Sequence, residues 1–173
     1  MMKKGKSVTR SFRVSETAFK ALEEDAARRN VSVNTLVNQL LLAYANWGRF
    51  FDKIGAVRIP KEAFSRLLDA SSDEEVIEAA RLSGLDTPRA IMLAKHGTLS
   101  LTTVLDFIRA GAAYGGYAEY SEVENQGKLV ITIMHNMGRK ASIYFGSLLE
   151  SIFANIDRHP KISSTEHSVL IEI

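Results

Sequence analysis

Apolar and polar residues alternate at the start of the chain and then change to a helical spacing. Residues 7–14, SVTRSFRV, alternate in type and predict a short β-strand. The stretch SETAFKALEEDAARRN follows, with Phe19, Leu22 and Ala26 on one helical face, Ser15 as its N-cap and a VSVN turn after it. The apolar stretch TLVNQLLLAYANW predicts a second helix. The predicted order is therefore strand, helix, helix.

This first segment cannot bury its own apolar surface. The predicted strand has no partner strand within residues 1–50, and an isolated strand leaves its backbone hydrogen-bonding groups unpaired. The second helix has a broader apolar face than the first can cover, formed by Val33, Leu36, Val37, Leu40, Leu41, Tyr44 and Trp47. We therefore expect two chains to pair their strands as a two-stranded antiparallel ribbon and to pack their helices together.

The rest of the chain predicts a separate α+β domain. The stretch FFDKIGAV, with Gly55 as a hinge, separates a first domain, residues 1–53, from a second, residues 56–173. In the second domain the spacing predicts helices followed by β-β-α-β: helices over 61–68, from Ser72 to Gly84, from Thr87-Pro88 and over 99–113, strands over 117–123 and 129–134, a helix over 138–156 and a strand over 168–173. We identify no family resemblance for this domain.

Composition narrows the classes of function. The chain has 173 residues, of which 46% are hydrophobic, enough for a small domain joined to a medium one. No stretch is apolar enough to span a membrane, and the basic start MMKKGKS is not followed by an apolar signal core. The absence of cysteine excludes disulfides, thiolate metal sites and thiol catalysis. We expect a cytoplasmic protein.

Charge is unevenly distributed along the chain. Residues 1–53 hold ten of the 22 Lys and Arg residues but only five of the 20 acidic residues, which leaves the remainder mildly acidic. A basic first domain suits a polyanionic partner such as nucleic acid, although a segment of this length can also become basic by chance.

Residues 5–50 resemble the ribbon-helix-helix family of DNA-binding proteins, of the Arc, MetJ and CopG type. The resemblance consists of the strand TRSFRV, the helix start SETAFKAL, the turn RRNVSVN and the apolar second helix, and it needs no gap. A helical hairpin with an unrelated extended arm is the alternative. The resemblance implies an intertwined dimer whose ribbon enters the major groove of double-stranded DNA, with Thr9, Ser11 and Arg13 facing the groove and Phe12 and Val14 facing the dimer core.

The chemistry of the outward residues suits base recognition. Arg13 can donate to both O6 and N7 of guanine, while Ser11 and Thr9 can donate to or accept from either base edge. Arg10 falls on the inner face, where a charge is costly, so we expect its head to turn toward the backbone or a phosphate.

Two further groups are expected to contact DNA phosphates. The backbone N–H groups of Ser32, Val33 and Asn34 at the start of the second helix resemble the phosphate clamp of the family. Lys3, Lys4 and Lys6 form a basic arm that either lies over neighbouring phosphates or is simply solvated.

The second domain contains only weak candidates for a functional site. His135, Arg139 and Lys140 lie between a predicted strand and a predicted helix and form a candidate site for an anionic small-molecule effector, although a turn with exposed cations is the more common meaning of such a pattern. The four histidines, His96, His135, His159 and His167, have no metal-binding spacing, so we expect no metal site and no cofactor. We find no catalytic motif and expect no enzyme.

These patterns together predict a homodimeric, sequence-specific DNA-binding transcription regulator whose second domain oligomerises or senses a ligand. Pairing of dimers into tetramers stays open. The alternative is an antitoxin-like DNA-binding protein whose C-terminal part binds a protein partner, and a third is an architectural protein without sequence preference. Antitoxin tails of this family are typically short and fold on binding, whereas residues 56–173 have the apolar content of an independent core.

Overall fold

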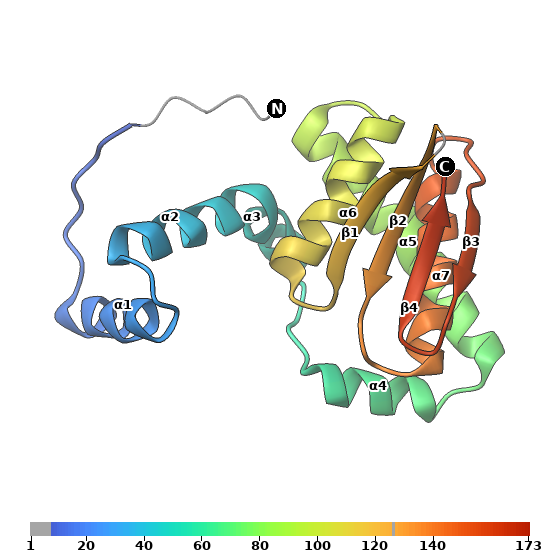
Figure 1. Ribbon diagram of the computed structural model, residues 1–173, viewed down its shortest axis with the longest axis horizontal. Helices are drawn as coiled ribbons and strands as arrows, with labels where there is room; N and C mark the ends of the chain where they lie inside the picture. Colours follow the sequence, from blue (N-terminus) through green and yellow to red (C-terminus); the bar gives the residue numbers. More distant parts are fainter. Residues whose placement is uncertain (1–7, 126) are drawn as a thin grey trace. The chain divides into compact units, whose positions relative to one another are not determined.

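The computed structural model describes residues 8–125 and 127–173, and the chain divides into two compact units (Figure 1). The first unit ends at Ala43 and the second begins at Tyr44, whereas the sequence predicted the division at residues 53–56. Residues 44–54 form a π-helical turn η1 (Tyr44–Gly48), α3 (Arg49–Phe51) and a 3-10 turn η2 (Asp52–Ile54). These three short elements belong to the second unit.

Packing of Trp47 explains why the second unit begins there. The Trp47 ring stacks on Phe51, with ring centroids 4.2 Å apart, and lies 5.5 Å from the ring of Phe107 in α6 (Leu101–Gly115). The sequence placed Trp47 on the apolar face of the second helix of the first domain. A periodic stretch of apolar residues does not show which neighbour will cover its last turn.

The described part of the first unit contains two helices. They are α1 (Glu16–Arg28) and α2 (Val33–Ala43), and only Ala26 and Leu36 are buried in the described part of this unit. Residues 8–14 form neither helix nor strand in the single chain. A two-stranded ribbon requires the strand of a second chain, so the ribbon stays a prediction.

The second unit is an α+β domain, which confirms the predicted fold class at that level. Its longer helices are α4 (Lys61–Asp69), α5 (Asp73–His96), α6 and α7 (Arg139–Ala154). Its strands are β1 (Glu119–Asn125), β2 (Lys128–Met134), β3 (Lys161–Ser164) and β4 (Ser168–Glu172), which form one antiparallel sheet in the order β1-β2-β4-β3. Figure 1 shows α5, α6 and α7 on one face of this sheet.

The predicted β-β-α-β order lacked one strand. β3 pairs with β4 in antiparallel register and makes the sheet four-stranded. It has four residues, KISS, of which only Ile162 is apolar, so it is too short to show an alternating pattern. Its partner strand, rather than its own sequence, makes it a strand.

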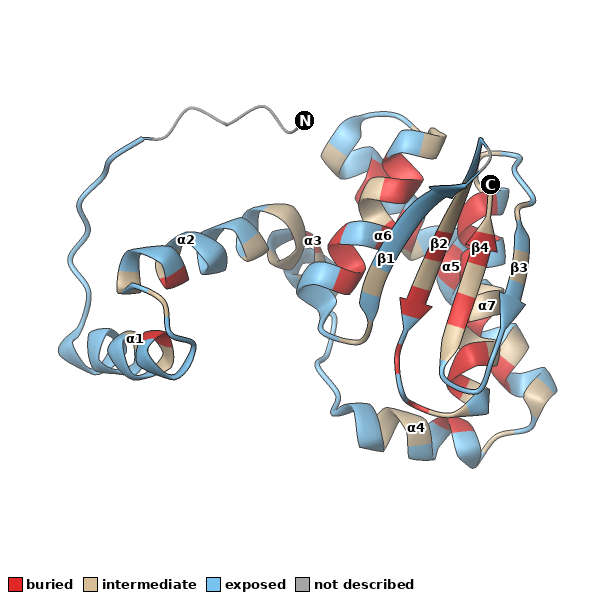
Figure 2. Ribbon diagram, in the orientation of Figure 1, coloured by how far each residue is buried: buried red, intermediate tan, exposed pale blue. Residues whose placement is uncertain are grey.

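The core lies between the sheet and its covering helices. Ile131 and Ile171 are cross-strand partners, as are Ile133 and Val169, and all four are buried. They pack with apolar residues of α7, namely Phe145, Leu149, Ile152 and Phe153. Figure 2 shows buried residues concentrated on these strands and helices. The alternation along β2 and β4 therefore reflects one face on the core and one face toward solvent.

α5 is a single helix of 24 residues, which corrects the prediction of one helix ending at Gly84 and another beginning at Thr87-Pro88. Gly84 is buried against α7, where a Cβ atom would lie 2.6 Å from the Leu148 carbonyl oxygen and 2.7 Å from Ser151 Cβ. Glycine is therefore placed where two helix backbones approach closely, and it does not end the helix.

A side chain at the C-terminal end of α7 compensates for the hydrogen bond that α5 loses at Pro88. A proline has no N–H, so in a helix the carbonyl four residues earlier loses its donor. Here that carbonyl belongs to Gly84, and Asn155 Nδ2 donates a hydrogen bond to it at 3.3 Å. The tertiary contact replaces the missing helical hydrogen bond, and α5 continues to its αL residue Gly97.

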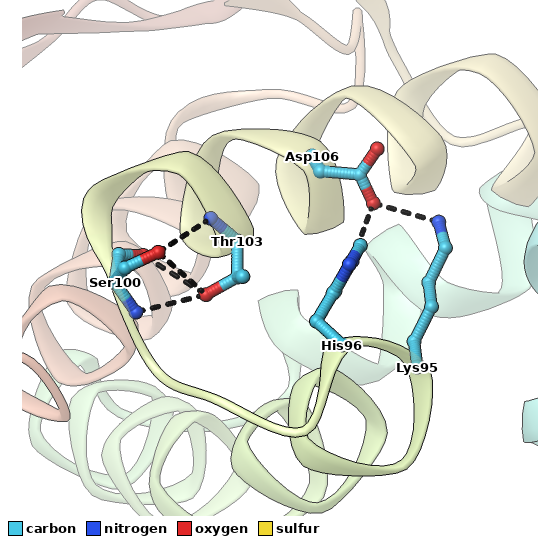
Figure 3. A network of polar contacts seen from close by, with 5 residues as sticks. All are labelled: Lys95, His96, Ser100, Thr103 and Asp106. Carbon is cyan, nitrogen blue, oxygen red and sulfur yellow. Dashed lines mark hydrogen bonds and ion pairs between the residues drawn. The ribbon is translucent and has the colours of Figure 1, made fainter.

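An ion-pair network ties the end of α5 to α6 (Figure 3). Asp106 Oδ2 accepts from Lys95 Nζ at 2.7 Å and contacts His96 Nε2 at 3.0 Å. Partial burial raises the pKa of Asp106, but the hydrogen bonds and positive charge of Lys95 and His96 outweigh it and lower the pKa below its ordinary value. Ser100 and Thr103 form a capping box at the start of α6.

None of the helices in the described residues combines the length and apolar content that crossing a bilayer requires.

Candidate nucleic-acid interface

α1 begins where the sequence predicted it. Ser15 has extended backbone angles, and its hydroxyl accepts a hydrogen bond from the Ala18 N–H at 3.3 Å. Glu16 in the first turn pairs with Lys20 at 2.7 Å. The cap ends the segment of residues 8–14 sharply, because the N-cap residue is extended and the next residue is helical.

A turn connects α1 and α2, as the sequence predicted. Asn30 adopts a left-handed conformation with φ of 54°, and the Val31 N–H donates to the Ala26 carbonyl at 3.0 Å. This is the hydrogen-bond pattern of a helix that ends in a left-handed residue. Ser32 caps α2, because its hydroxyl accepts a hydrogen bond from the Thr35 N–H at 3.1 Å.

The start of α2 presents backbone N–H groups that suit an anion. The first N–H groups of a helix have no acceptor within the helix, and here they belong to Val33, Asn34 and the preceding cap, Ser32. The first turn of α2 contains no acidic residue that would repel a phosphate. The three residues of the expected phosphate clamp therefore lie together at one helix end, with the positive end of the helix dipole behind them.

The three expected base-reading residues lie on the segment just before α1. Thr9, Ser11 and Arg13 are all exposed. Arg10 turns its head toward the backbone, as expected, and donates from Nη1 to the Thr9 carbonyl at 3.0 Å. The basic arm of Lys3, Lys4 and Lys6 lies outside the described residues.

The intervening apolar residues of the same segment are exposed too. Phe12 exposes 77% of its surface, and Val8 and Val14 are also exposed. The exposed set continues onto both helices, with Phe19 on α1 and the consecutive leucines Leu40, Leu41 and Leu42 on α2. Leu42 was absent from the predicted apolar face, although the uninterrupted run LLL was a signal that the apolar surface extends around α2. Within the described part of the chain, each of these side chains leaves between 45% and 77% of its surface exposed.

The residues of the candidate effector site all have protein partners. Arg139 donates from Nη2 to Asp73 Oδ2 at 2.6 Å and from Nη1 to Oδ1 at 3.2 Å. Lys140 Nζ donates to the carbonyl oxygens of Asp69 and Ser71. Arg139 therefore binds the first residue of α5, and Lys140 binds the end of α4 and the connection that follows it.

His135 is a buried structural residue. Its Nδ1 accepts from the Met137 N–H at 3.1 Å, so in the neutral ring Nε2 carries the proton and donates to Ser142 Oγ at 2.8 Å. Burial lowers the pKa of His135 to about 4, helped by the positive charges of His167 and Lys61. The ring therefore stays neutral near pH 7 and does not attract an anion.

The described residues contain no group of three or more histidine, cysteine, aspartate or glutamate side chains arranged to hold a metal ion. Comparison with known proteins found no match to a family model, to a curated protein or to a solved structure.

Proposed function

We propose that the protein is a homodimeric, sequence-specific DNA-binding transcription regulator that inserts a two-stranded antiparallel ribbon into the major groove. The observation that carries the proposal is the exposed apolar surface of the first unit, which includes Phe12, Val14, Phe19, Leu40 and Leu41. Two helices with only Ala26 and Leu36 buried have too small a core to be stable alone. A second copy that covers the apolar set supplies the missing core.

The energetics favour pairing of the first units. Full burial of one large apolar side chain contributes about 1.5 to 3 kcal/mol. Several such side chains on each chain would be buried at once, and pairing of residues 8–14 would satisfy backbone groups that a lone strand leaves open. Folding and association of this unit are then one process.

DNA is the partner that suits the outward side of this dimer. Thr9, Ser11 and Arg13 occupy alternate positions of the segment, so a ribbon that buries Phe12 and Val14 turns these three residues outward. The helix start at Ser32 adds a phosphate site on each copy. The proposal includes no catalytic activity and no cofactor, and it places the protein in the cytoplasm.

An antitoxin-like protein is the less well supported function. The C-terminal part of such a protein becomes ordered when it binds its partner. Residues 44–173 instead form a unit with its own buried core of sheet and helices. This unit suits an oligomerisation or sensing role better than that of a segment that folds on a partner.

Arg13→Ala tests the assignment of the groove-reading side. The expected result is a loss of about 1 to 3 kcal/mol of binding free energy for each contacted base in the preferred site, with little change for random duplex DNA. Equilibrium binding to both duplexes at one salt concentration measures the difference.

Replacement of Lys3, Lys4 and Lys6 by alanine is the matched comparison. These substitutions should weaken preferred and random DNA alike and flatten the salt dependence, because phosphate contacts release counterions without reading bases. If Arg13→Ala weakened both duplexes equally, Arg13 would belong with the phosphate contacts and the proposed ribbon orientation would be wrong.

A further inference from the structure

α5 carries an exposed apolar stripe. Leu82 and Leu85 expose 61% and 42% of their surface, and Glu78 and Arg89, also exposed, extend the same stripe in both directions. The four residues follow one another at intervals of four, three and four positions, so they share one side of the helix. Alternating intervals of four and three positions are typical of the residues that form the contact between two helices of a coiled coil, here called the seam.

The opposite side of α5 is already used. Val76, Ala80, Gly84 and Ile91 are buried, and Gly84 lies directly against the backbone of α7. These residues lie about half a turn around the helix from the exposed stripe. The second unit therefore covers one side of α5 and leaves the stripe to solvent.

The two charges of the stripe are free for a partner. Neither Glu78 nor Arg89 takes part in an ion pair within residues 8–125 and 127–173. They lie too far apart along α5 to pair with each other, because eleven positions correspond to about 16 Å of helix. Each charge flanks one end of the leucine pair.

The order of these residues is self-complementary. When two copies of α5 lie antiparallel about a point between residues 83 and 84, Leu82 faces Leu85 of the second copy. In the same arrangement Glu78 faces Arg89, and Arg89 faces Glu78. One two-fold operation therefore places apolar against apolar and negative against positive at every layer of the stripe.

We propose that α5 pairs antiparallel with α5 of a second copy of this chain through Glu78, Leu82, Leu85 and Arg89. A second copy is favoured over an unrelated protein because one sequence supplies both halves of the charge pattern. This pairing is independent of the proposed DNA binding, which uses the first unit. A chain with two self-association surfaces can join more copies than one surface allows, and pairing at one surface raises the effective concentration at the other.

Charge reversal in the full-length chain tests the pairing. Glu78→Arg places positive against positive at both ends of the seam, and Arg89→Glu places negative against negative. Each single substitution should raise the concentration at which the largest species is half dissociated about tenfold. The double substitution Glu78→Arg with Arg89→Glu should restore the wild-type value. Sedimentation equilibrium at low salt measures all four proteins.

A mixture of the two single variants is the most specific experiment in this test. Each variant repels itself, but the Glu78→Arg chain complements the Arg89→Glu chain at both charged layers. The equimolar mixture should therefore associate as tightly as wild type. If neither single substitution weakens association, or if neither the double variant nor the mixture restores it, the proposed pairing is wrong.

Leu82→Glu gives the largest expected effect at this surface, because it places a charge against Leu85 of the second copy. It should raise the dissociation concentration about 100-fold. Leu67→Glu is the control, since Leu67 on α4 is 60% exposed, almost the same as Leu82, and lies outside the seam. Equal effects of the two substitutions would overturn the proposal. The circular dichroism spectrum should be unchanged in both variants, because both side chains are exposed within the chain.

Discussion

Phe12→Glu is expected to abolish both pairing of the first units and binding to DNA. Phe12 exposes 77% of its surface in the single chain, so the substitution costs the isolated chain little. In the proposed ribbon the same position faces the dimer core, where a carboxylate without a partner costs several kcal/mol. The predicted result is more than about a 100-fold loss of affinity for the preferred duplex.

The measurement is binding of full-length variants to that duplex, together with their sedimentation. Val57→Glu is the matched control, because Val57 is 88% exposed and belongs to the second unit, outside the proposed ribbon. It introduces the same charge and should leave DNA binding unchanged. A Phe12→Glu protein that binds like wild type would place Phe12 outside any dimer core.

Gly84→Ala should lower the free energy of unfolding by at least about 2 kcal/mol. The added Cβ would lie 2.6 Å from the Leu148 carbonyl oxygen and 2.7 Å from Ser151 Cβ. The first of these neighbours is helix backbone and cannot rotate away, so α5 and α7 must separate. Alanine's better helix propensity, about 1 kcal/mol, offsets only part of the loss.

Gly146→Ala in α7 is the control for helix propensity. There the nearest atom to an added Cβ would be Ile162 Cγ2 at 3.9 Å, an ordinary contact distance. The free energy of unfolding should rise by up to about 1 kcal/mol. Denaturant unfolding measures both variants. A Gly84→Ala protein as stable as the Gly146→Ala protein would contradict the close approach of α5 and α7.

Elements with local signals could be predicted from the sequence. Ser15 caps α1, Ser72 and Glu75 form the capping box of α5, and the hairpin of β1 and β2 follows two alternating stretches. In each case the residues that determine the element lie within it or directly before it. Local hydrogen bonds and a regular apolar spacing are enough to indicate such an element.

The elements that the sequence did not predict correctly depend on tertiary contacts. A helix that continues through Gly84 and Pro88 depends on the close approach of α7 and on a hydrogen bond from Asn155, which is distant in sequence. β3 depends on its pairing with β4. The break at Gly84 also concealed the exposed stripe of α5, because its residues were divided between two predicted helices.

The candidate interface was predictable in its helical part. The turn at Asn30 and the cap at Ser32 are local, and the structure has both. The ribbon is different, because a strand formed between two chains cannot appear in one chain. The sequence could not distinguish Arg139 and Lys140 from a ligand site, because their partners, at the start of α5 and the end of α4, are distant in sequence.

Selection of duplexes by the full-length protein tests the central claim most directly. The protein is incubated with a pool of random duplex DNA, the bound molecules are amplified over several rounds, and the mass of the final complex is measured. The account predicts enrichment of one sequence with two half-sites in inverted order, bound by an even number of chains. A pool that stays random after selection, or a complex with a single chain, would contradict it.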